Sequence, residues 1–237
     1  MVYVTNDLHG YPLEKFRALL DKAGFTEKDF LVILGDVIDR GEHGAELLQW
    51  IIEQENVELI LGNHELMMLN CEFVFKEITD ESVDEVTAEN FTAFHNWQYN
   101  GAEETIRGLR KLDHDTVLDI IDYLKDCSLY EDVVINGRRF VLTHGGIGNF
   151  EKGKPLEEYD YYDLTWYRPS LSETFDEDFT LIVGHTPTAY YGEEYRGRMI
   201  RGEGWLNIDT GVAFGLDPMI LRLDDMKEFY TDTGENS

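Results

Sequence analysis

The chain is poor in cysteine and in long apolar runs, and each shortage argues against a class of protein. Only two cysteines occur among 237 residues, Cys71 and Cys127, and neither belongs to a Cys-x-x-Cys pair. This argues against a disulfide framework and against a zinc finger, so we expect free, buried thiols. No apolar run reaches the length that a membrane-spanning helix needs, so we expect no membrane partner.

Basic residues are also scarce, with 20 Lys and Arg against 48 Asp and Glu and a formal net charge of −28. A field of this sign repels nucleic acid and anionic membrane surfaces, so we expect no nucleic-acid partner. The simplest interpretation of the acidic residues is a solvated surface that resists aggregation.

The N-terminus lacks a charged and apolar export segment, because Val2-Tyr3-Val4 leads directly into a polar motif. We therefore expect a soluble, cytoplasmic protein. The length suits one domain, or one domain with a small insertion. The hydrophobic share of 43% is ordinary for a chain that folds.

Hydrophobic periodicity predicts β-α-β-α-β for the first third of the chain, which indicates the α/β class. A helical region follows over residues 66–125, interrupted near residues 79–88 by an acidic stretch. We interpret about residues 66–128 as a helical insertion that caps the molecule. The remainder is rich in strands and ends in a tail, residues 231–237, that we expect to be disordered. The predicted strands are residues 1–5, 30–34, 57–61, 133–136, 139–143, 181–184, 205–208 and 219–223, and the first two helices are residues 12–23 and 44–54.

Three polar motifs stand where early strands are predicted to end. They are Asp7-Leu8-His9-Gly10, Gly35-Asp36-Val37-Ile38-Asp39-Arg40-Gly41 and Gly62-Asn63-His64-Glu65. Successive motifs are separated by about thirty residues, the size of one strand-helix unit, so parallel strands would bring them to one edge of a sheet. Carboxylate, imidazole and amide groups there suit manganese, iron or zinc. The spacing therefore predicts a metal site.

Two histidine motifs follow later strands: Thr143-His144-Gly145-Gly146 and Gly184-His185-Thr186-Pro187. The flanking glycines let the backbone approach a ligand closely. We interpret His144 and His185 as metal ligands.

Together these motifs resemble the calcineurin-like metallophosphoesterases, and within them the phosphoprotein phosphatase branch, whose signature is GDxHG, GDxVDRG, GNHE and HGG. The match spans residues 5–211, with Ile38 in place of valine and Asn6 in place of the first glycine. The resemblance implies one catalytic domain over residues 1–237, with two mixed β-sheets packed as a sandwich, helices outside and the helical insertion over the site.

The resemblance also implies two divalent cations, manganese before iron or zinc. In the family such a pair activates a bridging water as the nucleophile. Carried over by position, Asp36 bridges the two ions, Asp7 and His9 hold the first, and Asn63, His144 and His185 hold the second.

The neighbours of these ligands are expected to act on the substrate. His64 would protonate the leaving group, and Asp39 would orient His64. Arg40 would grip phosphate oxygens through its planar guanidinium, together with Asn63. Arg168, in Trp166-Tyr167-Arg168, is similar to a second phosphate-contacting arginine of bacterial and phage members.

We therefore expect hydrolysis of a phosphate ester without a phosphoenzyme, because no motif supplies an activated Ser or Cys. The favoured substrates are phosphoserine and phosphothreonine in proteins, with phosphotyrosine as an addition. The alternative is symmetrical hydrolysis of bis(5'-nucleosyl) tetraphosphates such as diadenosine tetraphosphate, which close relatives perform. A third hypothesis is an inactive binding scaffold. The intact Asp36, His64 and Arg40 argue against it. The oligomeric state stays open, and a monomer is compatible with the sequence.

Overall fold

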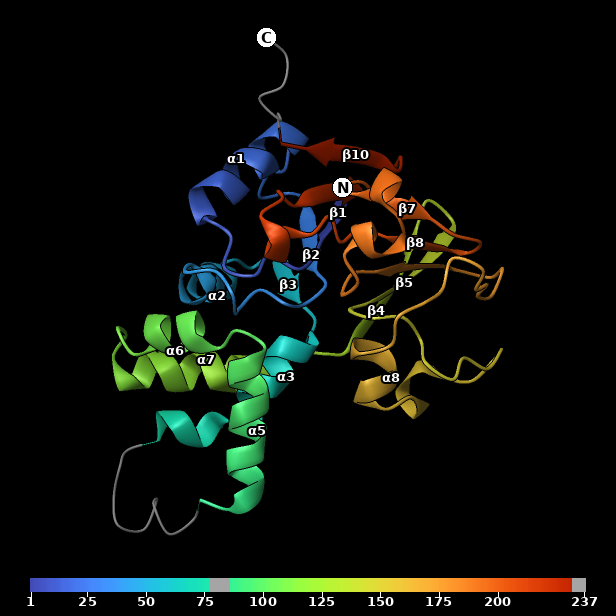
Figure 1. Cartoon of the computed structure of the whole chain (residues 1–237). Helices are drawn as coiled ribbons and strands as arrows, with labels where there is room; N and C mark the ends of the chain where they lie inside the picture. The colour runs from blue at the N-terminus through green and yellow to red at the C-terminus, as the bar shows by residue number, and fades with distance from the viewer. Residues whose placement is uncertain (77–85, 232–237) are drawn as a thin grey trace.

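A computed structural model describes residues 1–76 and 86–231 of the chain (Figure 1). Most of the acidic interruption predicted at residues 79–88, and all but the first residue of the tail predicted at residues 231–237, lie outside the described residues.

The first sheet contains the parallel strands predicted from the N-terminal third. Strands β1 (Val2–Thr5), β2 (Phe30–Ile33) and β3 (Val57–Leu59) lie side by side in parallel. The C-terminal strands β9 (Met219–Arg222) and β10 (Lys227–Tyr230) extend this sheet antiparallel beyond β1, in the order β10-β9-β1-β2-β3. No sequence pattern predicted β10, which is a short edge strand.

The second sheet has the order β4-β5-β6-β8-β7 and is also mixed. Strands β5, β6 and β8 run parallel, whereas the edge strands β4 and β7 are antiparallel to their neighbours. The predicted hairpin turn joins β4 to β5 through Asn136 and Gly137, both in the left-handed region at φ 52° and 77°. The strands are β4 (Tyr130–Ile135), β5 (Arg138–Thr143), β6 (Thr180–Val183), β7 (Ile200–Arg201) and β8 (Trp205–Asn207).

Alternate residues of each strand point to opposite sides of its sheet, so each sheet has one inner face, and the two sheets pack through these faces. In β1, Val4 joins the core between the sheets, while Tyr3 faces the flanking helices. Phe140 of β5 and Ile182 of β6 close the same inner core from the second sheet. The predicted architecture, two mixed sheets with helices outside, is confirmed.

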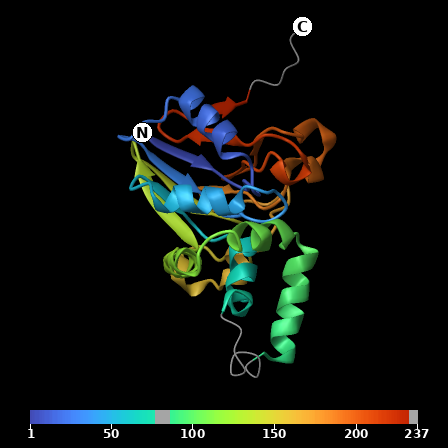
Figure 2. The same ribbon diagram turned by 90° about the vertical axis from the view of Figure 1, so that its left-hand side faces the viewer.

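Helices α1 (Leu13–Ala23) and α2 (Gly44–Ile52) cover the outer face of the first sheet (Figure 2). The apolar stripe of α1, including Phe16, is buried there, and Gly24 ends the helix in the left-handed conformation at φ 79°. The helical segments in the second half of the chain are short: α8 (Tyr161–Thr165), η2 (Leu156–Glu158), η3 (Thr188–Tyr191), η4 (Glu193–Tyr195) and η5 (Val212–Phe214).

The helical insertion lies beside α2, at the end of the sandwich where α3 begins (Figure 1). Helix α3 starts at Asn63, three residues before the predicted start, so the Asn63-His64-Glu65 motif forms its first turn. None of the helices within the described ranges is long and apolar enough to cross a membrane. The helices of this region are α3 (Asn63–Leu69), η1 (Glu72–Phe75), α5 (Ala88–Tyr99), α6 (Glu103–Leu109) and α7 (His114–Asp126).

Candidate metal centre

The predicted polar motifs meet at one rim of the sandwich, because the parallel strands of both sheets end there. Asp7 and His9 follow β1, Asp36 follows β2, and Asn63 and His64 open α3 directly after β3. From the second sheet, His144 follows β5 and His185 follows β6. All seven side chains are buried. The rim is formed by the carboxyl ends of the parallel strands, where ligands bind in α/β proteins.

The Asp36 carboxylate lies at the centre of this group. Its Oδ2 is 3.7 Å from Nε2 of both His9 and His64, and its Oδ1 is 3.3 Å from Nε2 of His144. Two triplets therefore share Asp36: His9-Asp36-His64 and Asp36-His144-His185, each with ligand atoms within 4.8 Å of one another. A carboxylate common to two triplets can bridge two cations.

The histidine rings are oriented as metal ligands usually are. Nδ1 of His144 lies 2.7 Å from the Leu34 carbonyl, and Nδ1 of His9 lies 3.0 Å from the Ile38 carbonyl. Because each carbonyl requires an N–H donor at Nδ1, the Nε2 lone pair faces the cluster. Nε2 of His185 is buried without a hydrogen-bond partner among the described residues. A buried, unpartnered imidazole nitrogen beside carboxylates fits a divalent cation.

The remaining two predicted ligands join the same cluster. Asp7 Oδ1 is 3.7 Å from Nε2 of His9, and its Oδ2 accepts a hydrogen bond of 2.9 Å from the His185 N–H. Oδ1 of Asn63 is 2.9 Å from Nε2 of His144. The structure thus brings together all six residues of the predicted ligand set.

Burial and neighbouring charges shift the pKa values of the carboxyl and imidazole groups in this cluster. Burial raises the pKa of Asp7 well above its usual value, and the carboxylates of Asp209 and Asp36 raise it further. Burial lowers the pKa of His144, but Asp36 and Asp7 outweigh it and bring that pKa to about 10. At neutral pH a cation entering the cluster must therefore displace protons from its ligands.

Metal affinity should consequently rise with pH. Because protons and cations compete for the ligands, we expect Mn²⁺ affinity of metal-stripped protein to increase about tenfold per pH unit from about pH 6 to about pH 8. Calorimetric titration at several pH values measures this slope. His144→Gln should weaken and flatten the dependence, whereas exposed His43→Gln, which loses only its contact with Glu46, should retain it. An affinity independent of pH in the wild type would contradict the assignment.

The loops that carry these residues are strained. Of the nine non-glycine residues with positive φ in the described part of the chain, six belong to the predicted site. Such conformations cost about 1–3 kcal/mol each and persist where surrounding contacts over-determine them, often at functional sites. The six residues, with φ between 39° and 69°, are Asp7, His9, Asp36, Asp39, Arg40 and His185.

Glu65 ties two of the motif loops together. Its fully buried carboxylate accepts hydrogen bonds from the backbone N–H groups of Asp36 at 2.8 Å, Val37 at 2.8 Å and Gly62 at 3.0 Å. Gly62 must lack a side chain, since an added Cβ would overlap Oδ1 of Asp36. This arrangement fixes the Asp36 loop against the start of α3.

His64, Asp39 and Arg40 lie next to the cluster as predicted from their positions in the motifs. Nδ1 of His64 is 2.6 Å from Oδ2 of Asp39, which accepts a hydrogen bond from it. The Arg40 guanidinium spans the cluster, with Nη1 3.3 Å from Nε2 of His9 and Nη2 3.2 Å from Nε2 of His64. Arg40 is exposed whereas Asp39 and His64 are buried, so Arg40 can meet a substrate from solvent.

Arg168 is brought to the second histidine loop. Its Nη1 donates to the His185 carbonyl at 2.9 Å and to Oγ1 of Thr186 at 3.0 Å. The residue is exposed, so its positive charge stands beside the cluster and faces solvent.

Sequence reasoning missed two site residues, Trp97 and Thr105. Both belong to the helical insertion, and both donate hydrogen bonds to the Asp39 carboxylate. They lie 58 and 66 residues from Asp39 in the chain. No motif or periodicity links them to it, because their partner is defined only by packing.

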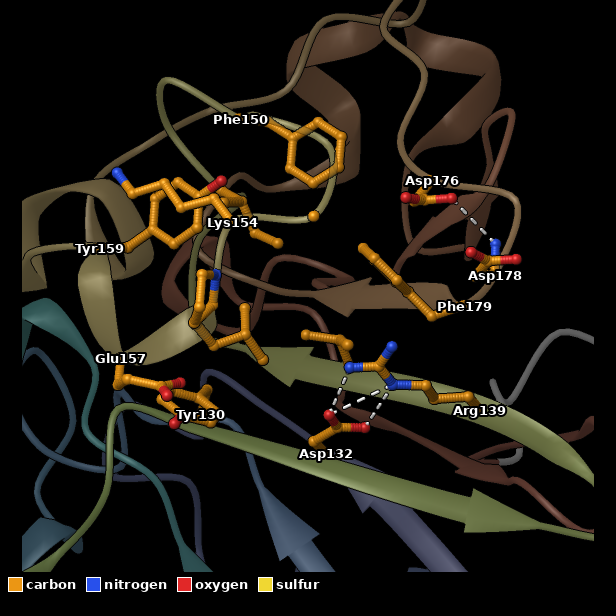
Figure 3. A pocket seen from close by; sticks show the side chains of 15 residues that line it. Tyr130, Asp132, Arg139, Phe150, Lys154, Glu157, Tyr159, Asp176, Asp178 and Phe179 are labelled. Carbon is orange, nitrogen blue, oxygen red and sulfur yellow. Dashed lines mark hydrogen bonds and ion pairs between the residues drawn. The ribbon is translucent and has the colours of Figure 1, made fainter.

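A separate pocket lies between strands β4 and β5 and the segment around Phe150 and Tyr159 (Figure 3). Its volume is about 370 Å³, and its Arg139 is paired with Asp132 at 2.6 Å. It shares no residue with the metal cluster, so we assign it no part in the chemistry described below.

Comparison with known proteins identifies the relatives of this chain. The sequence model of the calcineurin-like phosphoesterases matches residues 1–215. The asymmetrical bis(5'-nucleosyl)-tetraphosphatase PrpE of Halalkalibacterium halodurans is 24% identical, over 94% of this chain and 90% of its own. The symmetrical bis(5'-nucleosyl)-tetraphosphatase of Nitrosospira multiformis is 25% identical, over 98% and 96%.

Two solved structures share the fold. A protein provisionally named a diadenosine tetraphosphatase superposes with a TM-score of 0.64 and 14% identity, covering 96% of this chain and 90% of its own. The cold-active protein tyrosine phosphatase of a psychrophilic Shewanella superposes with a TM-score of 0.55 and 17% identity, covering 96% and 78%. At these identities the likeness shows the fold alone.

Proposed function

Because this chain belongs to the calcineurin-like phosphoesterase family and is a phosphoric ester hydrolase, we propose that it hydrolyses bis(5'-nucleosyl) tetraphosphates with the help of divalent cations. The observation that carries the metal-dependent chemistry is the central Asp36 carboxylate, shared by two ligand triplets. Manganese is the proposed metal, since its ligand preferences include carboxylate oxygen.

The sequence favoured a phosphoprotein substrate, whereas the proposal takes the alternative, a bis(5'-nucleosyl) tetraphosphate. The relatives from Halalkalibacterium halodurans and Nitrosospira multiformis match nearly the whole chain and are named for dinucleoside tetraphosphates, with asymmetrical cleavage in the first case and symmetrical cleavage in the second. Neither name mentions a protein substrate. The acidic surface disfavours a polyanion at long range, but cations bound at the rim would reverse the local field.

In the proposed centre two ions would share Asp36. Asp7 and His9 would complete the ligands of the first, and Asn63, His144 and His185 would hold the second. Bound cations would supply Lewis acidity and lower the pKa of a coordinated water. The protein's own contribution is to hold these six ligands buried and fixed by the backbone contacts described above.

Residues next to the proposed ligands act on the substrate in this proposal. His64 donates a proton to the departing phosphate oxygen, and Asp39, 2.6 Å from its Nδ1, keeps that ring in place. Burial lowers the pKa of His64, but Asp36 and Asp39 outweigh it, so the pKa is raised. Arg40 and Arg168 neutralise phosphate oxygens from two sides, and Asn63 adds an amide contact.

Aromatic rings near the second histidine loop support a nucleotide substrate. Trp166 lies 5.9 Å from the His185 ring, and Tyr162 stacks on Trp166 at 5.7 Å with planes 16° apart. Beyond Pro187, a pocket of about 380 Å³ is lined by the exposed pair Tyr190 and Phe214. Such rings can stack on nucleobases, at about 1–3 kcal/mol per base in single-stranded nucleic-acid complexes.

Substrate choice can be tested directly. Metal-stripped protein is supplied with Mn²⁺ and offered diadenosine tetraphosphate, phosphoserine and phosphotyrosine peptides, and p-nitrophenyl phosphate. We expect kcat/KM for the dinucleotide to exceed that for either peptide by at least about 100-fold, a difference of about 2.7 kcal/mol in transition-state binding.

The products define the cleavage: two ADP indicate symmetrical attack, and ATP with AMP indicate asymmetrical attack. A peptide hydrolysed faster than the dinucleotide would restore the phosphoprotein hypothesis. No turnover of any substrate with Mn²⁺, Fe²⁺ or Zn²⁺ would overturn the proposed function.

A further inference from the structure

The Asp39 carboxylate is completely buried and has three side-chain donors, of which His64 is only one. Oδ2 accepts from Nδ1 of His64 at 2.6 Å and from Nε1 of Trp97 at 2.8 Å. Oδ1 accepts from Oγ1 of Thr105 at 2.5 Å. Trp97 comes from α5 and Thr105 from α6. The helical insertion therefore supplies two of the three groups that fix this carboxylate.

The insertion also holds the backbone of the same loop. Oγ1 of Thr105 accepts the N–H of Asp39 at 2.8 Å, and the Gly101 carbonyl accepts the N–H of Arg40 at 3.0 Å. Asp39 and Arg40 are consecutive left-handed residues, at φ 68° and 69°. Two strained residues in succession need contacts that specify them, and these contacts come from the insertion.

Gly101 brings the insertion directly against the Arg40 side chain. Its φ of 104° is rarely adopted by other residues, and an added Cβ would stand 2.8 Å from Cγ of Arg40. The missing side chain thus lets the turn between α5 and α6 lie on the stem of the arginine that spans the cluster.

Trp97 has little freedom to adopt another orientation. Its side chain is completely buried and packs edge-to-face on Phe75, with ring centroids 6.2 Å apart. Thr105 is equally buried, with 1% of its surface exposed. Because a buried donor without its acceptor is costly, the positions of these two donors and of the Asp39 carboxylate determine one another.

We propose that Trp97 and Thr105 are positioning residues for the reaction: they hold Asp39 against His64 and, with Gly101, hold Arg40 across the metal cluster. In this view the helical insertion completes the catalytic loop. The inference rests on the roles proposed above for His64 and Arg40.

Paired variants separate positioning from stability. Trp97→Phe keeps the ring and removes the N–H, and Thr105→Val keeps the shape and removes the hydroxyl. Trp205→Phe is the matched control, because it also removes an indole N–H that makes a hydrogen bond. Trp205 lies in β8 of the second sheet, and its N–H donates to the Glu173 carbonyl at 3.1 Å. Thr105→Ser should restore the hydroxyl contact. Turnover of diadenosine tetraphosphate with Mn²⁺ and unfolding midpoints are measured for all four.

We expect Trp97→Phe and Thr105→Val to lower kcat by about 10- to 100-fold, the range typical of removing a group that orients a metal-binding side chain, with KM close to wild type. Trp205→Phe should keep wild-type kcat despite a similar loss of stability, and Thr105→Ser should recover most of the activity. Equal kcat values for Trp97→Phe and Trp205→Phe would overturn the inference.

A second measurement keeps the inference distinct from the proposed function. In ¹H–¹⁵N spectra of the metal-free protein at one pH, Trp97→Phe and Thr105→Val should shift the ring nitrogens of His64, and Trp205→Phe should not. If the wild type hydrolyses no substrate, the proposed function fails while these shifts still decide the positioning. Unchanged His64 resonances in both insertion variants would contradict the positioning role of Trp97 and Thr105.

Discussion

Asp36→Asn should abolish metal-dependent hydrolysis, with kcat/KM lowered by at least about 1,000-fold, or about 4 kcal/mol of transition-state stabilisation. Asp36 is the one carboxylate common to both ligand triplets, with oxygens 3.3 Å from His144 and 3.7 Å from His9. An amide carries no charge and coordinates through one oxygen, so the two proposed cations would lose their shared anionic ligand.

The fold should survive this substitution. Oδ1 of Asp36 accepts the N–H of His64 at 3.0 Å, and an asparagine oxygen can accept it equally. The pKa of Asp36 is lowered well below its usual value, since His144, His64 and His9 outweigh the effect of burial, so the variant also removes a buried charge. Elemental analysis should find less bound metal, with an unfolding midpoint near wild type.

Asp176→Asn is the control for Asp36→Asn. It neutralises another buried carboxylate, paired with Lys152 at 3.1 Å and remote from the cluster. It should retain full metal content and activity. If Asp36→Asn kept both metals and more than about a tenth of the wild-type kcat/KM, a difference of under 1.4 kcal/mol, the bridging role would be wrong.

His64→Asn should lower kcat by about 100- to 1,000-fold, within the range that a positioned general acid contributes. Its metal content should remain that of the wild type, because His64 is proposed to protonate the leaving group and not to coordinate a cation. Steady-state kinetics with diadenosine tetraphosphate and elemental analysis of the same preparations provide the two measurements. His43→Asn, at an exposed histidine outside the cluster, is the control.

The geometry makes this a sharp test. Nε2 of His64 is 3.7 Å from Oδ2 of Asp36, the same distance as Nε2 of His9, so His64 is also placed where a ligand could be. A variant that loses one metal together with its activity would show that His64 is a ligand. Wild-type kcat in the variant would exclude both roles.

Much of the fold could be predicted from local patterns. The apolar alternation of β1 and the stripe of α1 each report the environment of a few neighbouring residues, and the structure places both as expected. The short edge strand β7 was not predicted, because Ile200–Arg201 becomes a strand only by pairing with β8. Helix α3 begins earlier than its apolar pattern, since its first turn is made of buried polar residues.

The substrate was predicted less well than the chemistry. The residues around Asp36 belong to motifs of fixed spacing, which the chemistry requires. Substrate choice depends on surfaces such as the rings near Trp166 and Tyr190, which have no fixed spacing from those motifs. The full-length relatives therefore moved the proposal from phosphoproteins to dinucleotides.

The order of residues along the chain is enough to place polar residues at strand ends, because each motif lies one strand-helix unit from the next and local periodicity marks those units. Which of these residues lie close enough to hold one cation, and which fix one another, depends on how the folded chain packs. Asp7 and His185, 178 residues apart, meet because two sheets pack with their carboxyl ends at one rim. Trp97 and Thr105 reach Asp39 because the insertion packs on the loop. A hydrogen bond depends on distances across the folded chain, and spacing along the sequence does not contain them.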